Sequence, residues 1–281
     1  MTRKDRSLVK SFLAGSFSGT CSCLLFQPLD LIKTRVQTPA VYGSNGMLSI
    51  ISTVVRTDSI TGLWRGVTPT ISRTVPGVGI YFCALHAIKT LLFVSTEPKA
   101  WQNVLLGFTA RSVAGVSLLP ITVVKTRYES GIFDYRGVSS ALVSIWKSEG
   151  VKGLFSGCAA TVARDAPFSG LYLMFYNKAK ELSRKGFGEK ELNTNLHFMC
   201  GISAGVLASV ATQPADVVKT QMQLYPFRYK STIDCVIIVV KNNGPSGLFR
   251  GTLPRCIRRT LMAALTWTVY ESVMQRLGLK V

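Results

Sequence analysis

Three arginines occupy equivalent places in the three thirds of this 281-residue chain, and one acid stands beside them. Arg73, Arg164 and Arg258 each follow, by seven residues, the last glycine of a Gly-Leu-aromatic-x-Gly element. A guanidinium binds a carboxylate through two parallel hydrogen bonds, so these arginines favour a carboxylate ligand. Asp165 is the only acid in its apolar stretch and could hold an ammonium group. The set therefore predicts a small zwitterion, unless Asp165 simply pairs with Arg164 or Arg258.

A second set of charged residues recurs with the same period. It begins at Pro28, Pro120 and Pro214, which stand 92 and 94 residues apart, and the Gly-Leu-aromatic-x-Gly elements recur after 91 and 94 residues. Two and five residues after each proline come the paired positions Asp30 and Lys33, Thr122 and Lys125, Asp216 and Lys219. Two independent elements that share one period indicate three tandem repeats rather than chance recurrence.

Long apolar stretches position these charges. Apolar residues make up 47% of the chain and charged residues 17%, with a net charge of +19. A disordered basic chain is excluded, and a soluble domain would carry about a quarter charged residues. Residues 11–29 and 192–215 hold no charge, and about 20 apolar residues in a helix cross a bilayer. Four further stretches are interrupted by arginines, so a hydropathy scan would miss some of six spans.

Each third reads as a helix, a proline kink, a charged motif, a short helix, an aromatic-basic-glycine turn and a second helix. The short helices are expected at 47–56, 138–147 and 232–241. The predicted fold is an all-α membrane protein of six transmembrane helices with pseudo-threefold symmetry. Its three two-helix repeats, residues 1–97, 98–188 and 189–281, form one transmembrane domain.

The three proline motifs resemble the P-x-[DE]-x-x-[KR] signature of the mitochondrial carrier family over essentially the whole chain, with Thr122 in place of the acid in the second motif. The resemblance implies a multi-pass transporter of the mitochondrial inner membrane, working as a monomer with one central site and alternating access. Residues 73–82, 164–176 and 258–271 resemble the glycine-carrying branch, which imports glycine for the first step of haem synthesis. The alternatives are another small amino acid or carboxylate, nucleotide exchange, or proton leak.

The family's pairing order implies a matrix gate of bridges between repeats. It joins Asp30 to Lys125 and Asp216 to Lys33, whereas the third contact joins Lys219 to the neutral Thr122. The positions nine past each proline resemble braces beneath these bridges, and they hold Gln37, Glu129 and Gln223. Glu129 could partly replace the missing acid. Two bridges and one Thr–Lys contact predict a weaker gate than three bridges.

The resemblance also implies a cytosolic gate, with an acid and a base 13 and 16 residues after each central arginine. These positions hold His86 and Lys89, Asn177 and Lys180, Glu271 and Met274. Only Lys180 with Glu271 would form a full bridge, with Lys89 and Asn177 at best a hydrogen bond. The sequence therefore predicts a weakly latched matrix-open state.

Arg111 departs from the repeat pattern, because the equivalent positions are Gly19 and Gly205. It lies eleven residues before Thr122, which is nearly the same helix face. We expect it to line the cavity and to bind the carboxylate or pair with Asp165, unless it snorkels to the surface or is structural.

The aromatic turns predict lipid contacts. Helix N-termini bind phosphate, and the family holds cardiolipin at such turns. The candidate residues are Trp64, Arg65 and Gly66; Phe155 and Gly157; Phe249, Arg250 and Gly251. Ser156 replaces the basic residue of the second turn, which is expected to be the weakest site.

Other classes of protein find no support in the sequence. The seven cysteines form no C-x-x-C pair and only two histidines accompany them, so no metal site is predicted. The sequence has no catalytic motif, so no enzyme activity is predicted. Bound cardiolipin is expected, and no other cofactor. A nucleic-acid partner would explain the net charge but not the apolar spans. Residues 1–6 are too short for a cleavable presequence, so an internal address is expected.

Overall fold

The computed structural model describes residues 3–38, 46–92, 100–187 and 194–276, and within these ranges the fold is all-α. The helices that build the spans, called the long helices whether or not a break divides the span, are α1 (Arg3–Val36), α4 (Val67–Leu92), α5 (Ala100–Ser117), α6 (Leu119–Ser130), α8 (Cys158–Phe187), α9 (Thr194–Ala211), α10 (Gln213–Leu224) and α12 (Thr252–Arg276). The short helices are α3 (Met47–Asp58), α7 (Val138–Leu154) and α11 (Thr232–Asn243), with 3-10 turns at Ile60–Trp64 and Pro245–Phe249.

The long helices form six spans, namely α1, α4, α5 with α6, α8, α9 with α10, and α12. The two paired spans bend by 64° and 52° where α5 gives way to α6 and α9 to α10. Each break falls two residues before a motif proline, because the residue before proline disfavours helical geometry and proline lacks an N–H. In the first repeat Pro28 lies inside the unbroken α1.

Hydropathy alone identifies fewer spans. Among the described residues, Ile60–Leu91 is the one helical stretch long and apolar enough to cross a membrane, and the two bent pairs pass the same test when joined. Of the interrupted spans, α8 and α12 do not pass within the described residues, whereas α4 passes in spite of Arg73 and the pair of α5 and α6 passes in spite of Arg111. α1 does not pass, although residues 11–29 hold no charge. The expectation that a hydropathy scan would miss interrupted spans is therefore confirmed for two of them only.

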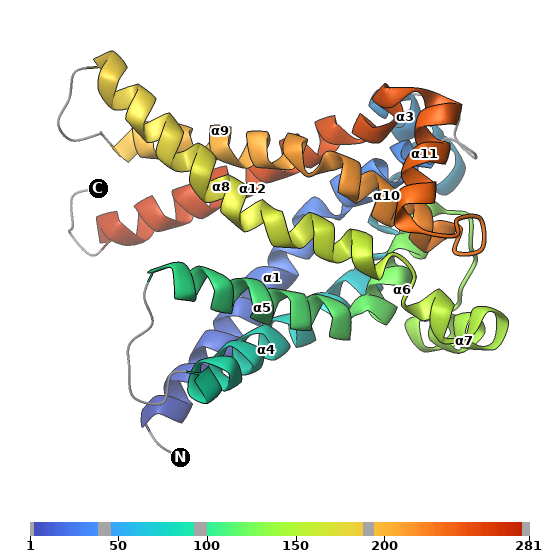
Figure 1. The fold of residues 1–281 in the computed structure, drawn as a ribbon, viewed down its shortest axis with the longest axis horizontal. Helices are drawn as coiled ribbons and strands as arrows, with labels where there is room; N and C mark the ends of the chain where they lie inside the picture. The colour runs from blue at the N-terminus through green and yellow to red at the C-terminus, as the bar shows by residue number, and fades with distance from the viewer. Residues whose placement is uncertain (1–2, 39–45, 93–99, 188–193, 277–281) are drawn as a thin grey trace.

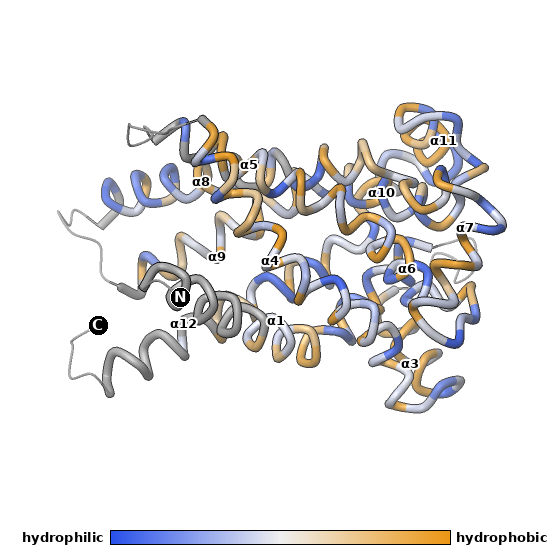
Figure 2. Tube along the Cα trace, turned by 90° about the horizontal axis from the view of Figure 1, so that it is seen from below, coloured by the Kyte–Doolittle hydropathy of each residue, from blue (hydrophilic) through white to orange (hydrophobic). Residues whose placement is uncertain are grey.

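The six spans close into a ring. Contacts run from α1 to α4, α4 to α5, α5 to α8, α8 to α9, α9 to α12 and α12 back to α1. Figure 1 shows the spans meeting at the end that carries α3, α7 and α11 and spreading apart toward the end that carries the termini. Hydrophilic residues are frequent around the short helices and along the outer turns of α8 (Figure 2). This ring has the predicted pseudo-threefold arrangement.

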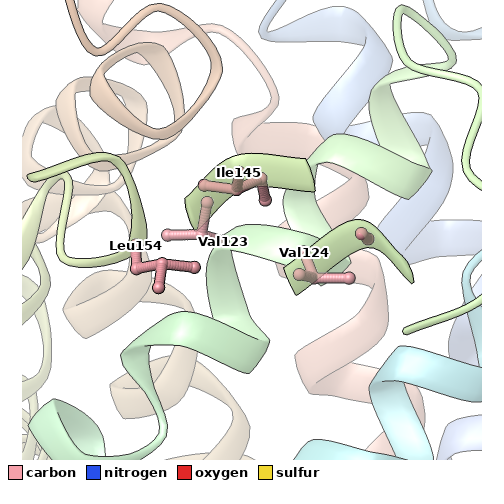
Figure 3. Packing of buried hydrophobic residues seen from close by; sticks show 5 residues of the cluster. Val123, Val124, Ile145 and Leu154 are labelled. Carbon is pink, nitrogen blue, oxygen red and sulfur yellow. The ribbon is translucent and has the colours of Figure 1, made fainter. Parts of the chain in front are cut away.

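Each short helix packs on the segment that follows a motif proline, and equivalent residues make the three contacts. In the second repeat Val123 and Val124 of α6 pack against Ile145 and Ala141 of α7 (Figure 3). Their counterparts are Leu31 with Ile50 and Val54 in the first repeat, and Val218 with Cys235 and Val239 in the third. Burial of these apolar side chains fixes the short helices against the gate segments.

The predicted starts of the short helices are confirmed, but the helices end later than expected. α3 and α11 extend two residues further, and α7 is continued to Leu154 across a kink at Gly150, where φ is +67°. The equivalent positions, Ser59 and Gly244, have φ of +64° and +69°. A left-handed backbone at this point therefore recurs in every repeat, although the first repeat has no glycine there.

Candidate functional site

Two ion pairs between repeats join the spans where they meet. Lys33 Nζ of α1 lies 2.6 Å from Asp216 Oδ2 of α10, and Lys125 Nζ of α6 lies 2.8 Å from Asp30 Oδ2 of α1. The acids are buried, with Asp216 1% exposed. Proline places these charges on the convergent segments, and buried charges require partners. Both predicted bridges are therefore present, and this end of the ring is closed.

Two of the three brace residues contact these bridges, as expected, and the third contacts a threonine instead. Gln37 Nε2 donates to Asp216 Oδ2 at 2.9 Å, and Glu129 Oε1 lies 3.3 Å from Lys125 Nζ. Gln223 accepts a hydrogen bond from Thr126 at 2.7 Å. Glu129 thus supports the existing Lys125 pair, and no ion pair takes it to Lys219, whose acid partner is missing.

Three threonines orient the braces, and sequence reasoning missed them. Thr34 donates to Glu129 Oε2, Thr126 to Gln223 Oε1 and Thr220 to Gln37 Oε1, at 2.9, 2.7 and 2.7 Å. Each threonine directly follows the motif lysine, so its recurrence was visible in the sequence. Which side chain it would bind depended on how the repeats meet.

The third gate contact is not formed. Thr122 Oγ1 donates to the carbonyl of Leu118, one turn earlier, at 3.0 Å. The Lys219 ammonium makes no hydrogen bond or ion pair with the residues that the structure describes, although its side chain is buried. The predicted Thr122–Lys219 contact is therefore wrong for this structure, because the short hydroxyl is already used within its own helix.

The central arginines are coupled to the gate acids. Arg258 Nε lies 2.8 Å from Asp30 Oδ1, and Arg164 Nη1 donates to Asp216 Oδ1 at 3.2 Å. Each gate acid thus pairs with a lysine across the gate and with an arginine of the predicted substrate site. Spacing alone suggested two separate layers of charge, whereas the structure joins them in one network.

Asp165 is engaged by its neighbour in this structure. Arg164 donates from Nε to Asp165 Oδ1 at 2.7 Å and from Nη2 to Asp165 Oδ2 at 2.9 Å. Of the two roles expected for Asp165, the ion pair with Arg164 is the one present. Arg73 differs, because in the described part of the chain its buried Nε has no hydrogen-bond partner and its guanidinium forms no ion pair, whereas Arg258 Nε, which also lacks a hydrogen bond of good geometry, lies 2.8 Å from Asp30. Arg73 is therefore the arginine most available for a carboxylate.

The repeat that carries these gate and central residues occurs three times along the chain. The family model described as "Mitochondrial carrier protein" matches residues 4–95, 96–187 and 190–280. The chain belongs to the mitochondrial carrier protein family. Among its relatives is the mitochondrial glycine transporter of Homo sapiens, 54% identical over 97% of this chain and 91% of that protein. The mitochondrial glycine transporter of Mus musculus is 53% identical over 97% and 86%, and mitochondrial glycine transporter B of Danio rerio 50% identical over 97% and 96%.

Within this carrier fold, the predicted cytosolic gate lies at the spread end. His86, Lys89 and Asn177 are exposed, and Lys180 Nζ lies 5.4 Å from the centre of the Tyr176 ring. The side chain of Glu271 lies outside the described residues, so the Lys180–Glu271 bridge stays a prediction. Arg111 is exposed in α5 and forms no ion pair with Asp165, although Asp165 is within its electrostatic range.

The aromatic turns of the carrier repeats have a shared geometry. Gly66, Gly157 and Gly251 have φ of +92°, +72° and +78°, a region that side chains other than glycine rarely adopt. The adjoining aromatics Trp64, Phe155 and Phe249 are exposed. One nitrogen of the Arg65 guanidinium, Nη2, already donates a hydrogen bond to the carbonyl of Phe133 at 3.2 Å. Arg250 lies beside Gly251, and its carbonyl accepts from Gln213 Nε2 at 2.7 Å.

Two further ion pairs hold the short helices, and sequence reasoning missed both. Arg127 makes a two-point contact with Glu149 at 2.7 and 2.6 Å, and Arg35 lies 3.4 Å from Asp58. An acid at the end of α3 and α7 recurs at the repeat spacing, which was the available signal. The third repeat replaces these charges with Gln221 and Asn243.

The described residues contain no group of three metal-ligating side chains.

Proposed function

We propose that this chain imports glycine across the mitochondrial inner membrane by alternating access and supplies haem synthesis. Its relatives over nearly its whole length are named mitochondrial glycine transporters. The observation that carries the mechanism is the network in which each gate acid pairs with both a gate lysine and a central arginine. We propose that the protein has no catalytic activity of its own.

Substrate enters from the spread, cytosolic end and reaches the arginines above the closed matrix gate. Arg73, with its unpartnered Nε, binds the carboxylate, and Asp165 receives the ammonium group as its pair with Arg164 loosens. A carboxylate that competes for Arg164 or Arg258 weakens their pairs with Asp216 or Asp30. Binding thereby lowers the free energy needed to open the gate, as a population shift requires.

The proposed substrate is small and uncharged overall. Asp165 pairs with Arg164 and with no gate lysine among the described residues, whereas Asp30 and Asp216 also hold gate lysines. Asp165 therefore matches the single ammonium group of an amino acid and disfavours a nucleotide, whose phosphates it would repel. Arg111 adds positive charge near this site and is proposed to attract the carboxylate. One methyl group in a pocket changes binding by about 1–3 kcal/mol, so alanine is the natural competitor to glycine.

Uptake of radiolabelled glycine by the purified protein in liposomes tests the proposal. We expect saturable uptake, competition by unlabelled glycine above alanine and serine, and no competition by ADP. Protein-free liposomes are the control. Uptake of alanine, serine or ADP without uptake of glycine would contradict the proposed substrate.

We further propose that the transporter works as a monomer and binds cardiolipin at the aromatic turns. Exposed aromatics and backbone amides at helix starts support phosphate binding there. Thermal unfolding in detergent with and without cardiolipin tests this, and stabilisation by cardiolipin but not by a neutral lipid is the expected result.

A further inference from the structure

The three repeats use one rule at the matrix gate. The lysine and the brace of one repeat lie against the acid position of a neighbouring repeat. Lys33 and Gln37 of the first repeat both contact Asp216 of the third. Lys125 of the second contacts Asp30 of the first. By the same rule, Lys219 and Gln223 of the third repeat are expected against Thr122 of the second, and Gln223 Oε1 accepts from Thr126, one turn after Thr122.

At this third position two donors are left without an acceptor. The Lys219 side chain is buried, with 7% exposure for the residue, and has no bonding partner among the described residues. Gln223 is 0% exposed, and its Nε2 has no hydrogen-bond partner there. They stand four residues apart on α10 and therefore share one face of the helix. Buried polar groups are normally satisfied, so the buried Gln223 amide without an acceptor indicates a missing ligand, and the unpaired Lys219 ammonium on the same face indicates that this ligand is an anion.

The orientation of the Gln223 side-chain amide is fixed by the hydrogen bond that its oxygen, Oε1, accepts. Its Oε1 accepts from Thr126, just as Gln37 Oε1 accepts from Thr220. In the Gln37 case this directs Nε2 toward the acid, Asp216. The equivalent Nε2 of Gln223 is thereby directed toward position 122, where a carboxylate would stand in the other two repeats.

No group of the residues that the structure describes fills the place of that carboxylate. Gln37 Nε2 also donates to the carbonyl of Arg250, but in the second repeat the equivalent bond, from Gln223 Nε2 to Ser156, is not made. Ser156 instead donates its own hydroxyl to the carbonyl of Met222 at 2.6 Å. The hydroxyl of Thr122 is neutral and is used as a donor within α6.

We propose that Lys219 Nζ and Gln223 Nε2 form a second carboxylate site on the transport path, which binds the carboxylate of the transported amino acid at the closed matrix gate. The amino acid is named on the strength of the proposed function. An ammonium and an amide N–H give one charge-assisted and one neutral hydrogen bond to the carboxylate. Asp165 binds Arg164, whose Nη1 donates to Asp216 Oδ1 at 3.2 Å, and Asp216 stands one helical turn before Lys219 on α10. With its ammonium group at Asp165, the substrate can pass its carboxylate from Arg73 to Lys219.

This site exists only while the gate is closed. Lys219 and Gln223 belong to α10, Thr122 and Thr126 to α6, and α6 and α10 are in contact in this structure. Opening the matrix gate separates the two helices and removes Thr126 from Gln223. The site then loses its geometry, and the carboxylate is released toward the matrix.

The first test supplies the missing carboxylate from the chain. We expect Thr122→Asp to raise the thermal unfolding temperature of the purified protein by several degrees, and to reduce glycine uptake because the site is filled. Thr122→Val, which has the shape of threonine without the hydroxyl, is the control and should not stabilise. In a Lys219→Met background Thr122→Asp should destabilise instead. Equal effects of Thr122→Asp in both backgrounds would overturn the proposal.

The second test uses the ligand and needs no new charge. We expect glycine and acetate to stabilise the wild-type protein against heat, whereas glycinamide, which has no carboxylate, should not. Lys219→Met should weaken apparent glycine binding about tenfold or more, and Lys219→Arg should restore most of it. Unchanged glycine binding by Lys219→Met, or stabilisation by chloride alone, would overturn the site.

The two proposals fail in different ways. If the wild-type protein takes up no glycine, the proposed substrate is wrong, and stabilisation by acetate that depends on Lys219 still decides whether the carboxylate site exists. If wild-type uptake is normal and Lys219→Met binds glycine as well as wild type, only the second site is wrong.

Discussion

At the scale of single residues, the arginines of this carrier differ in what they already bind. Arg164 holds Asp165 with two hydrogen bonds and Asp216 with a third, whereas Arg73 has an unpartnered buried Nε. The three equivalent positions in sequence are therefore not equivalent in chemistry. Their difference has two sources, namely Asp165, which no other repeat has at this position, and the gate acids, because Arg164 and Arg258 pair with Asp216 and Asp30 whereas the third acid position holds Thr122.

Replacing Asp165 with Asn should weaken glycine binding about tenfold, because the ammonium group loses its charged acceptor while Arg164 keeps Asp216. Inhibition of uptake by acetate should weaken less than inhibition by glycine, since acetate has no ammonium group. Inhibition constants for both compounds in liposomes measure this. Glu181→Gln on the same helix is the control, because Glu181 is exposed and its surface ion pairs contribute little. An equal loss for acetate and glycine would contradict the role of Asp165.

At the scale of elements, each short helix is fixed by apolar packing on the gate segment and by a pair at its C-terminal end. The pair is buried in the second repeat, partly exposed in the first and replaced by neutral residues in the third. Tyr229 there donates to Gln221 Oε1 at 3.1 Å, and Cys235 lies in the packed cluster. Burial raises the pKa of the Cys235 thiol to about 12, which keeps it protonated and unreactive.

Glu149→Gln should reduce stability more than Asp58→Asn. The Arg127–Glu149 pair is buried with two short contacts, and removing one partner leaves an uncompensated guanidinium at a cost of about 3 kcal/mol. Asp58 is 36% exposed and its contact is 3.4 Å, so its loss costs about 1 kcal/mol or less. Thermal unfolding of both variants compares them, and equal losses would show that burial is not the deciding factor.

Ser59→Gly should stabilise the protein by about 1 kcal/mol. Ser59 has φ of +64° and ψ of +179°, a backbone region essentially restricted to glycine, and the equivalent residues Gly150 and Gly244 are glycines. Ser59→Ala retains the strained backbone and is the matched control. Thermal unfolding of both variants measures the gain, and equal stability of the two would remove backbone strain as the reason.

At the scale of the whole molecule, the gate and the substrate site form one buried network at the narrow end of the ring. Lys125 has a second partner in Glu129, whereas Arg258 depends on Asp30 for its ion pair among the described residues. If Asp30 is removed, Lys125 therefore keeps an acidic partner in Glu129, whereas Arg258 loses its ion pair. Asp30 thus links the gate, through Lys125, to the substrate site, through Arg258.

Double-mutant cycles should reveal this asymmetry. We expect a larger coupling energy between Asp30→Asn and Arg258→Met than between Asp30→Asn and Lys125→Met, both within about 0.5–3 kcal/mol. The free energy of unfolding of the single and double variants measures it. A larger coupling for Lys125 would show that the gate bridge, rather than its link to the substrate site, dominates this end of the molecule.

The sequence by itself determined the three repeats, the six spans and the proline breaks of the second and third repeats, because each depends on residue types that recur at one spacing. The pairing of the two gate bridges came from the resemblance to the carrier family. The sequence also located Arg73, Arg164, Arg258 and Asp165. Only the tertiary structure decided that Arg164 binds both Asp165 and Asp216, that Arg258 binds Asp30, and that Thr122 leaves Lys219 and Gln223 without an acceptor. These contacts join side chains about 50 to 230 residues apart or compete for one acceptor. Their outcome depends on how the six helices meet, which no local pattern records.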